Sequence, residues 1–100
     1  MILHCVTFEF VEGTTPEQVT AVTAGLAQLP AQIPSLLRYE HGPDLGVREG
    51  TADYAVAAWV SDTEGLAGYL DHPAHVAAVG TLLGPLVASR QAVQLAVAGV

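Results

Sequence analysis

Four short segments of this chain alternate between two side-chain faces with the period of a β-strand, and two segments with helical spacing lie between them. The strand-like segments are residues 2–10 (ILHCVTFEF), 35–42 (SLLRYEHG), 54–60 (YAVAAWV) and 91–97 (QAVQLAV). The helical segments follow the first and the third of them. The order β-α-β-β-α-β is typical of an α+β, ferredoxin-like protomer with a four-stranded antiparallel sheet.

The first helical segment has a clear beginning and end. Thr15 in the cap position, Pro16 in the first turn and Gln18 three residues after the cap form a capping-box pattern. Pro30 and Pro34 predict the end of the helix, because proline interrupts helical hydrogen bonding. The expected buried stripe contains Val19, Val22, Leu26 and Leu29.

The second helical segment is predicted to be broken in the middle. Ser61, with Glu64 three residues on, is expected to cap a helix over residues 62–70. His72 then takes a second cap position, because Pro73 suits the first turn of a new helix. The apolar stripe of this second part is expected to contain Val76, Val79 and Leu83.

The length, charge and cysteine content of the chain limit the number of domains, the kinds of binding partner and the cellular compartment. One hundred residues fit one domain spanning residues 1–100. The net charge is −7, and the basic residues are three arginines, so we expect neither a nucleic acid nor an anionic membrane as partner. The single cysteine, Cys5, excludes an internal disulfide, and the first residues do not resemble a signal peptide. These features favour a cytoplasmic protein.

Both faces of the predicted sheet carry apolar side chains, although helices cover only one face in this fold. Leu3, Cys5 and Trp59 share one parity, and Val6, Phe8 and Val56 share the other. A bare apolar sheet face would be a large exposed patch. Pairing two sheets face to face would bury it, so the sequence predicts a homodimer in which the two sheets form an α/β barrel.

A stretch of seven residues, YLDHPAH (69–75), holds two of the four histidines in the chain. Together with HCVTFEF, EGTTPEQ, AQIPSLLRYEHGPD and the PLV that follows the motif, it resembles the stress-responsive dimeric α/β-barrel (Dabb) family over nearly the full length. The resemblance implies a ferredoxin-like protomer in a homodimer. One branch, that of olivetolic acid cyclase, closes poly-β-ketone chains by aldol condensation without a cofactor.

Resemblance to that branch implies a site between the sheet and the helices. It implies that His75 is the catalytic histidine, Tyr69 its tyrosine partner and His4 a histidine on the first strand. A further strand histidine of the branch falls at Tyr54, and its large aromatic residues on the first helix are replaced by smaller ones, so the substrate need not be the same. The expected substrate pocket contains Val6, Phe8, Val56, Ala58 and His72.

The two histidines of the motif are expected to differ in role. His75 lies in the first turn of a helix, where the helix dipole favours the neutral imidazole that a general base requires. The alternative is a structural role, in which the His75 side chain forms a hydrogen bond with the end of its own helix. His72 has a stronger structural than catalytic case, as a cap. Histidine on an apolar strand face, as at His4, is usually a satisfied core residue, and His41 is expected at the surface.

Three functions remain open at this stage. The first is a cofactor-free enzyme, most simply a polyketide cyclase-like catalyst acting on a small hydrophobic carbonyl compound. The second is a non-catalytic, stress-associated ligand-binding protein, and the third is a cofactor-independent monooxygenase with the same barrel architecture. We expect no metal, because His72 and His75 have no further ligand at a recognised spacing.

Overall fold

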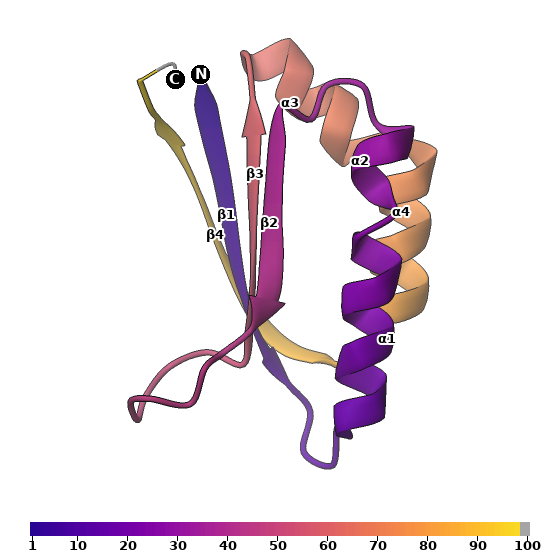
Figure 1. Cartoon of the computed structure of the whole chain (residues 1–100), viewed down its shortest axis with the longest axis vertical. Coiled ribbons are helices and arrows are strands. Elements are labelled where there is room, and N and C mark those ends of the chain that lie inside the picture. Colours follow the sequence, from indigo (N-terminus) through magenta and orange to yellow (C-terminus); the bar gives the residue numbers. More distant parts are fainter. Residues whose placement is uncertain (99–100) are drawn as a thin grey trace.

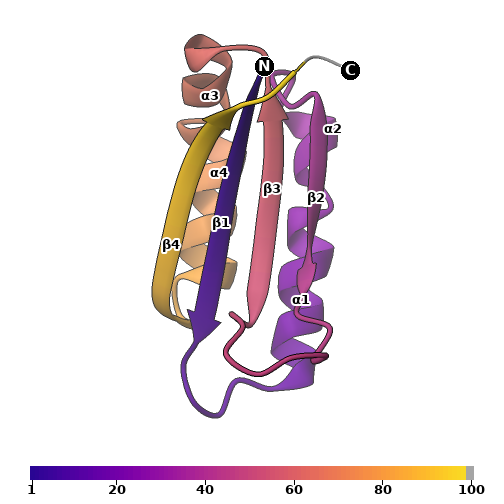
Figure 2. The same ribbon diagram turned by 90° about the vertical axis from the view of Figure 1, so that its left-hand side faces the viewer.

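The computed structural model describes residues 1–98 and confirms the predicted ferredoxin-like protomer. Four strands form one antiparallel sheet in the order β2-β3-β1-β4. Their bounds are Ile2–Phe10 for β1, Arg38–Pro43 for β2, Tyr54–Val60 for β3 and Val87–Ala96 for β4. The long central strand β1 pairs with both β3 and β4, which makes β4 an edge of the sheet (Figure 2).

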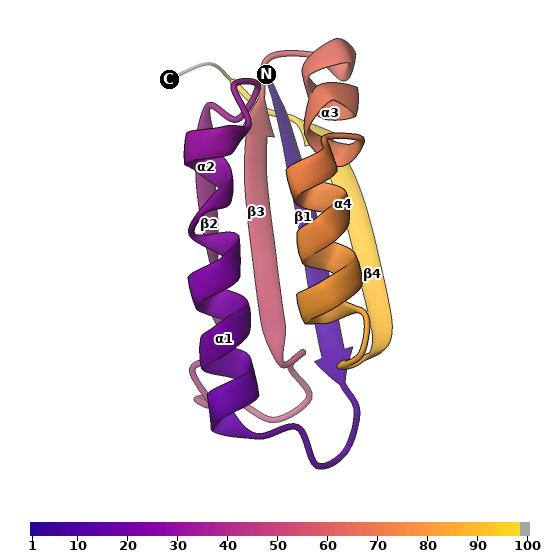
Figure 3. The same cartoon turned by 90° about the vertical axis from the view of Figure 1, so that its right-hand side faces the viewer.

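All helices lie on one side of the sheet (Figure 1). They are α1 (Pro16–Leu26), α2 (Leu29–Gln32), α3 (Thr63–Leu70) and α4 (Pro73–Ala78), and α4 continues into one turn of π-helix, η1 (Val79–Leu83). Seen from the helical side, α1 and α2 run beside α3, α4 and η1 (Figure 3). Gly25 of α1 lies so close to η1 that a methyl group there would overlap the Leu82 side chain.

The predicted helix starts are confirmed in two places and wrong in one. Thr15 and Gln18 form the capping box, and His72 accepts a hydrogen bond from the Ala74 amide through Nδ1 at 3.0 Å. The cap of α3 is Asp62 rather than Ser61, because the Asp62 carboxylate accepts from the Gly65 amide at 2.8 Å.

Several predicted boundaries also shift. Pro30 does not end a helix but lies in the first turn of the short helix α2, where its missing amide hydrogen costs nothing. The strand β2 begins at Arg38 rather than at Ser35, and β4 begins at Val87, four residues before the predicted start. The prediction that Val76 belongs to the buried stripe is wrong, since this residue of α4 is 58% exposed.

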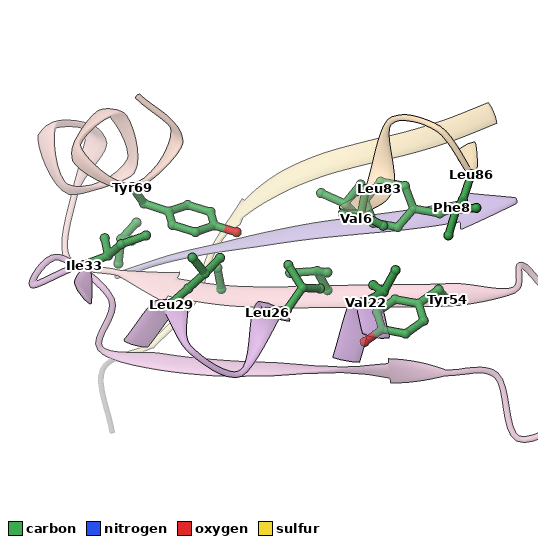
Figure 4. Close-up of a cluster of buried hydrophobic side chains, with 13 residues drawn as sticks. Val6, Phe8, Val22, Leu26, Leu29, Ile33, Tyr54, Tyr69, Leu83 and Leu86 are labelled. Carbon is green, nitrogen blue, oxygen red and sulfur yellow. The ribbon is translucent and has the colours of Figure 1, made fainter. Parts of the chain in front are cut away.

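The hydrophobic core lies between the sheet and the helices (Figure 4). Three of the four residues of the predicted α1 stripe are fully buried, and Val19 packs against the core from its edge. The core comprises Val6, Phe8, Val22, Leu26, Leu29, Ile33, Tyr54, Val56, Ala58, Val60, Tyr69, Leu83 and Leu86.

Within the described residues 1–98, no helix covers the other face of the sheet (Figure 1). One row across this face, given by the strand register, is Arg38, Trp59, Leu3 and Leu95. Cys5 and Val93 lie opposite each other in the next row, and the side chains of Val93 and Leu95 are 55% and 43% exposed. The protomer therefore presents an apolar sheet face, as the sequence predicts.

Candidate active site

A cavity of about 650 Å³ lies between the helix-facing side of the sheet and the segment α3–α4–η1. Every strand contributes to its wall, and most of the wall is apolar. Polar groups enter at a few points, mainly from β1, β2, β4 and the YLDHPAH motif. The lining residues are His4, Val6, Phe8, Leu26, Tyr39, Val56, Tyr69, Leu70, His75, Val79, Leu83, Gly84, Val87, Arg90, Ala92 and Gln94.

His75 reaches the cavity from the first half of α4 and is half-buried. Its Nδ1 lies 3.0 Å from the backbone carbonyl oxygen of Leu70. A carbonyl oxygen only accepts hydrogen bonds, so Nδ1 carries the hydrogen and Nε2 of the neutral ring keeps its lone pair. The interruption between α3 and α4 at His72 makes the bond between His75 and Leu70 possible, because it brings the end of α3 beside the first turn of α4.

The neutral form of His75 is favoured at physiological pH. Burial is the largest influence and lowers the pKa of the imidazole below its ordinary value, while the bond to Leu70 opposes this. The nearby His4 and Arg90 lower the pKa further, and Asp71 acts in the opposite direction. A neutral imidazole with one free ring nitrogen is the form that accepts a proton.

The Tyr69 ring is close to both histidines of the cavity. Its ring centroid is 4.5 Å from that of His75 and 6.1 Å from that of His4. Figure 4 shows the Tyr69 side chain reaching from α3 over the sheet, with its hydroxyl directed toward the interior. Burial raises the pKa of Tyr69, so the hydroxyl stays protonated and remains a hydrogen-bond donor.

His4 has the same tautomer as His75. Its Nδ1 lies 2.7 Å from the side-chain oxygen Oε1 of Gln94, which accepts the hydrogen bond. Nε2 of His4 is then the nitrogen with a lone pair. Burial lowers the pKa of His4, which the bond to Gln94 opposes, so this ring is also neutral at physiological pH. The cavity thus holds two neutral imidazoles, each with its ring close to that of Tyr69.

A second tyrosine adds a hydroxyl without a partner. Tyr39 of β2 lines the cavity, its ring lies 6.0 Å from that of Tyr69, and its hydroxyl is buried without a hydrogen-bond partner among residues 1–98. Leaving a buried donor unpaired costs about 1–3 kcal/mol. Burial raises the pKa of Tyr39 strongly, and the neighbouring Tyr69 hydroxyl raises it further, so the two phenol groups lie close enough to interact although they do not form a well-aligned hydrogen bond. The Tyr39 hydroxyl therefore stays protonated, and a bound ligand can accept a hydrogen bond from it.

Of the residues expected at the site, His4, Val6, Phe8, Val56, Tyr69 and His75 line the cavity. Ala58 and His72 do not, which corrects two of the predicted pocket residues. Ala58 is 0% exposed and lies between His4 and Tyr39 in the strand register, where its short side chain is covered. The His72 imidazole is engaged at the helix cap.

Sequence reasoning missed three polar residues of the cavity, namely Tyr39, Arg90 and Gln94. Two of them lie on β4, in register with Phe8 and His4 of β1 respectively. The alternation in QAVQLAV assigned one face of this strand to valine and leucine. The residues that alternate with them, counted back to Arg90, form the other face of β4, and this face carries Arg90 and Gln94.

The histidine expected at the surface belongs to a second polar cluster. Nδ1 of His41 lies 3.0 Å from the Tyr54 hydroxyl, and this hydroxyl lies 2.9 Å from Oγ1 of Thr23. Tyr54 is buried in the core, and the cluster ties β2 and β3 to α1. None of the three residues lines the cavity, so their role is to join the sheet to the helix.

Across residues 1–98, no three side chains of histidine, cysteine, aspartate or glutamate gather closely enough to hold a metal ion. No helix within this range has the length and apolar character needed to cross a bilayer.

The arrangement of sheet, helices and cavity has counterparts among known proteins. The model of the family described as "Stress responsive A/B Barrel Domain" (Dabb) matches residues 2–97. The chain belongs to the Dabb family. The match spans the whole sheet and every residue of the cavity, so the cavity is part of the family domain.

Two relatives share substantial sequence with this Dabb chain. The uncharacterized protein SCO4036 of Streptomyces coelicolor is 33% identical over 81 residues, which cover 79% of this chain and 84% of that protein. A crystal structure of a dimeric ferredoxin-like protein of unknown function from Thermobifida fusca has 42% identity and a TM-score of 0.90. That similarity covers 96% of this chain and 90% of the other.

Some solved enzymes share the fold at much lower identity. A hydroxynitrile lyase from Passiflora edulis has a TM-score of 0.82 over 99% of this chain and 94% of its own. An antibiotic biosynthesis monooxygenase has a TM-score of 0.73 over 99% of this chain and 100% of its own. Each is 14% identical, so these similarities concern the fold alone.

Proposed function

We propose that this Dabb protein is a cofactor-independent enzyme that removes a proton next to a carbonyl group of a small, largely apolar ligand. The reaction that fits best is an aldol-type cyclisation. The observation that carries the proposal is the state of His75, whose Nδ1–H is held by Leu70 O while the ring lines a cavity beside Tyr69. The match of His4, Tyr69 and His75 to the cyclase branch of the family supports the same chemistry.

The reaction would begin at Nε2 of His75. This nitrogen takes the proton from the carbon beside the carbonyl, and the C–H electrons move onto the carbonyl oxygen as an enolate. The hydroxyls of Tyr69 and Tyr39 donate hydrogen bonds to that developing charge. The enolate carbon then attacks a second carbonyl of the same ligand, a C–C bond forms, and protonated His75 returns its proton to the new alkoxide.

The walls of the cavity would fold the ligand. Its β1, β3 and α1 sides are formed by Val6, Phe8, Val56 and Leu26, and Val79 and Leu83 form the η1 side. Apolar walls exclude water from the enolate, which strengthens hydrogen bonds to it. His4 adds a second imidazole nitrogen with a free lone pair near Tyr69 and is proposed to accept a hydrogen bond from a hydroxyl or enol group of the ligand.

The working form of the enzyme is proposed to be a homodimer. The apolar face with Leu3, Trp59, Val93 and Leu95 has no cover within the protomer, and the similar Thermobifida protein is described as dimeric. Since the cavity lies on the helical side of the sheet, pairing through the opposite face would leave it accessible. The dimer would thus stabilise the sheet on which the site is built.

Proton abstraction can be tested without the natural substrate. In D₂O, the rate at which an unactivated ketone such as nonan-2-one exchanges its α-protons reports the base directly by NMR. We expect the wild type to accelerate this exchange and His75→Asn to lose the acceleration by on the order of 10²- to 10⁴-fold. Asparagine retains a donor for Leu70 O but has no basic nitrogen.

The matched control is His72→Asn, the same substitution three residues away. Asparagine is a good cap residue, so this variant should keep both the fold and the exchange rate. Equal exchange by wild type and His75→Asn would reject the enzyme proposal. Ketone binding without any exchange would instead indicate a ligand-binding protein, and His75-dependent consumption of O₂ with an aromatic substrate would indicate a monooxygenase.

A further inference from the structure

Arg90 is the single cation of the cavity lining, and no carboxylate lines the cavity with it. This contrasts with the chain as a whole, which has ten acidic residues and a net charge of −7. Aspartate and glutamate are therefore kept away from the cavity while one of the three arginines is placed there. A positive charge at this place in an acidic protein indicates that the cavity binds an anionic group.

The other two arginines have different surroundings. Arg38 lies on the uncovered sheet face, 3.5 Å from a Glu40 carboxylate oxygen and 4.8 Å from the centre of the Trp59 ring. Arg48 lies in the exposed β2–β3 connection. Within residues 1–98, Arg38 and Glu40 form the single ion pair. Arg90 therefore has no carboxylate partner in the described part of the chain.

Arg90 belongs to the solvent-exposed part of the cavity lining, on the β4 side. It lies on the edge strand β4, opposite Phe8, and its side chain is exposed although it lines the cavity. Gln94, which bonds to His4, is four residues further along the same strand, roughly 13 Å away at the rise of a β-strand. An extended ligand can therefore contact Arg90 with one end and approach His4 and Tyr69 with the other.

We propose that Arg90 binds a carboxylate group of the ligand at the mouth of the cavity, so that the substrate class is an apolar keto acid. The keto group of this substrate rests on the proposed function, and its carboxylate group rests on the position of Arg90. A planar guanidinium forms paired hydrogen bonds with a carboxylate. A phosphate-rich carrier fits less well, because it would bring several negative charges to an acidic protein with one cation at the site.

Anchoring by Arg90 would fix the direction of the ligand. With the carboxylate held at the exposed β4 side, the rest of the chain has to enter along β4 toward the phenols of Tyr69 and Tyr39. The carbonyl groups then lie where His75 can reach the carbons between them. Arg90 is accordingly a binding and orienting residue, distinct from the base.

The experiment compares two inert ligands of equal length by isothermal titration calorimetry, namely nonanoate and nonanamide. The wild type should bind nonanoate about 2- to 5-fold more tightly, the value of an ion pair with a solvent-exposed arginine. Arg90→Gln should remove this preference and leave nonanamide affinity nearly unchanged. Added salt should weaken the preference, because Arg90 is exposed.

Arg48→Gln is the matched control, since it removes the same charge from a residue that does not line the cavity. It should keep the preference for nonanoate. The proposal is overturned by equal affinities in the wild type, by absence of binding of either ligand, by a preference that survives Arg90→Gln, or by a preference that Arg48→Gln also removes. Because nonanoate undergoes no aldol chemistry, an Arg90-dependent preference would stand even if His75→Asn left proton exchange unchanged.

Discussion

Replacement of His72 by alanine tests the structural half of the HPAH sequence. The His72 imidazole accepts a hydrogen bond from the Ala74 amide at 3.0 Å, and Pro73 supplies no amide hydrogen of its own at the start of α4. Alanine would leave the Ala74 donor without this partner. Loss of a capping side chain typically costs about 1 kcal/mol of unfolding free energy.

The structure indicates why this cost should be measurable. The helix α4 has six residues and depends on its cap and on η1, whose Leu83 is buried in the core. For a domain of this size, about 1 kcal/mol corresponds to a decrease in Tm of roughly 4–8 °C. Urea denaturation followed by circular dichroism should show a lower midpoint with an unchanged slope.

His72→Asn separates the cap from other effects of losing the ring. The asparagine side chain can accept from the same amide, so this variant should recover most of the lost stability. Proton exchange of the ketone by the alanine variant should fall only to the extent that α4 frays and releases His75. The reasoning is refuted if the alanine variant is as stable as the wild type, or if the asparagine variant is as unstable as the alanine variant.

Three further predictions follow from the same geometry. Since burial holds the pKa of His4 and His75 below 6.5 in the folded protein, the folded state binds fewer protons than the unfolded one. Unfolding free energy should therefore decrease as pH falls from about 7 through the ordinary histidine value, and His75→Asn should flatten this dependence in urea titrations; a steeper one would contradict it. Tyr69→Phe should slow ketone α-proton exchange by about 10- to 100-fold, less than His75→Asn, because it deletes one donor to the enolate. An unchanged rate would remove Tyr69 from the mechanism. Light scattering should give twice the chain mass of 10.3 kDa for the wild type and close to 10.3 kDa for Val93→Glu, which places a charge in the uncovered sheet face; a variant that stays dimeric would locate the interface elsewhere.

The fold was predictable because local signals and global order agree. The alternation in ILHCVTFEF separates the residues of β1 into two faces, and the capping box at Thr15 fixes where α1 begins. Errors occurred where two local signals compete. Ser61 and Asp62 are both good caps, and only the direction in which the chain leaves β3 decides that Asp62 accepts from the Gly65 amide.

The site was less predictable, since its residues come from separate elements. Resemblance to the family pointed to His4, Tyr69 and His75, which the fold brings into one cavity. Arg90 and Tyr39 carry no motif. The importance of Arg90 arises from its place in the cavity lining without a carboxylate partner, and that of Tyr39 from its buried hydroxyl. Those properties depend on the register of β4 against β1 and on the packing of β2, which one sequence does not specify.

The two faces of β1 divide the proposed work of the protein. His4, Val6 and Phe8 face the helices and line the cavity, whereas Leu3 and Cys5 lie on the uncovered face where a second copy is proposed to pack. A slip of one residue in register would exchange the two sets and remove site and interface together. Pairing of β1 with β3 on one side and with β4 on the other opposes such a slip, since both ladders would have to shift at once. Because the register is held in this way, substitutions on the cavity-facing side of β1 should affect catalysis alone. Substitutions on the uncovered side should affect dimer formation alone.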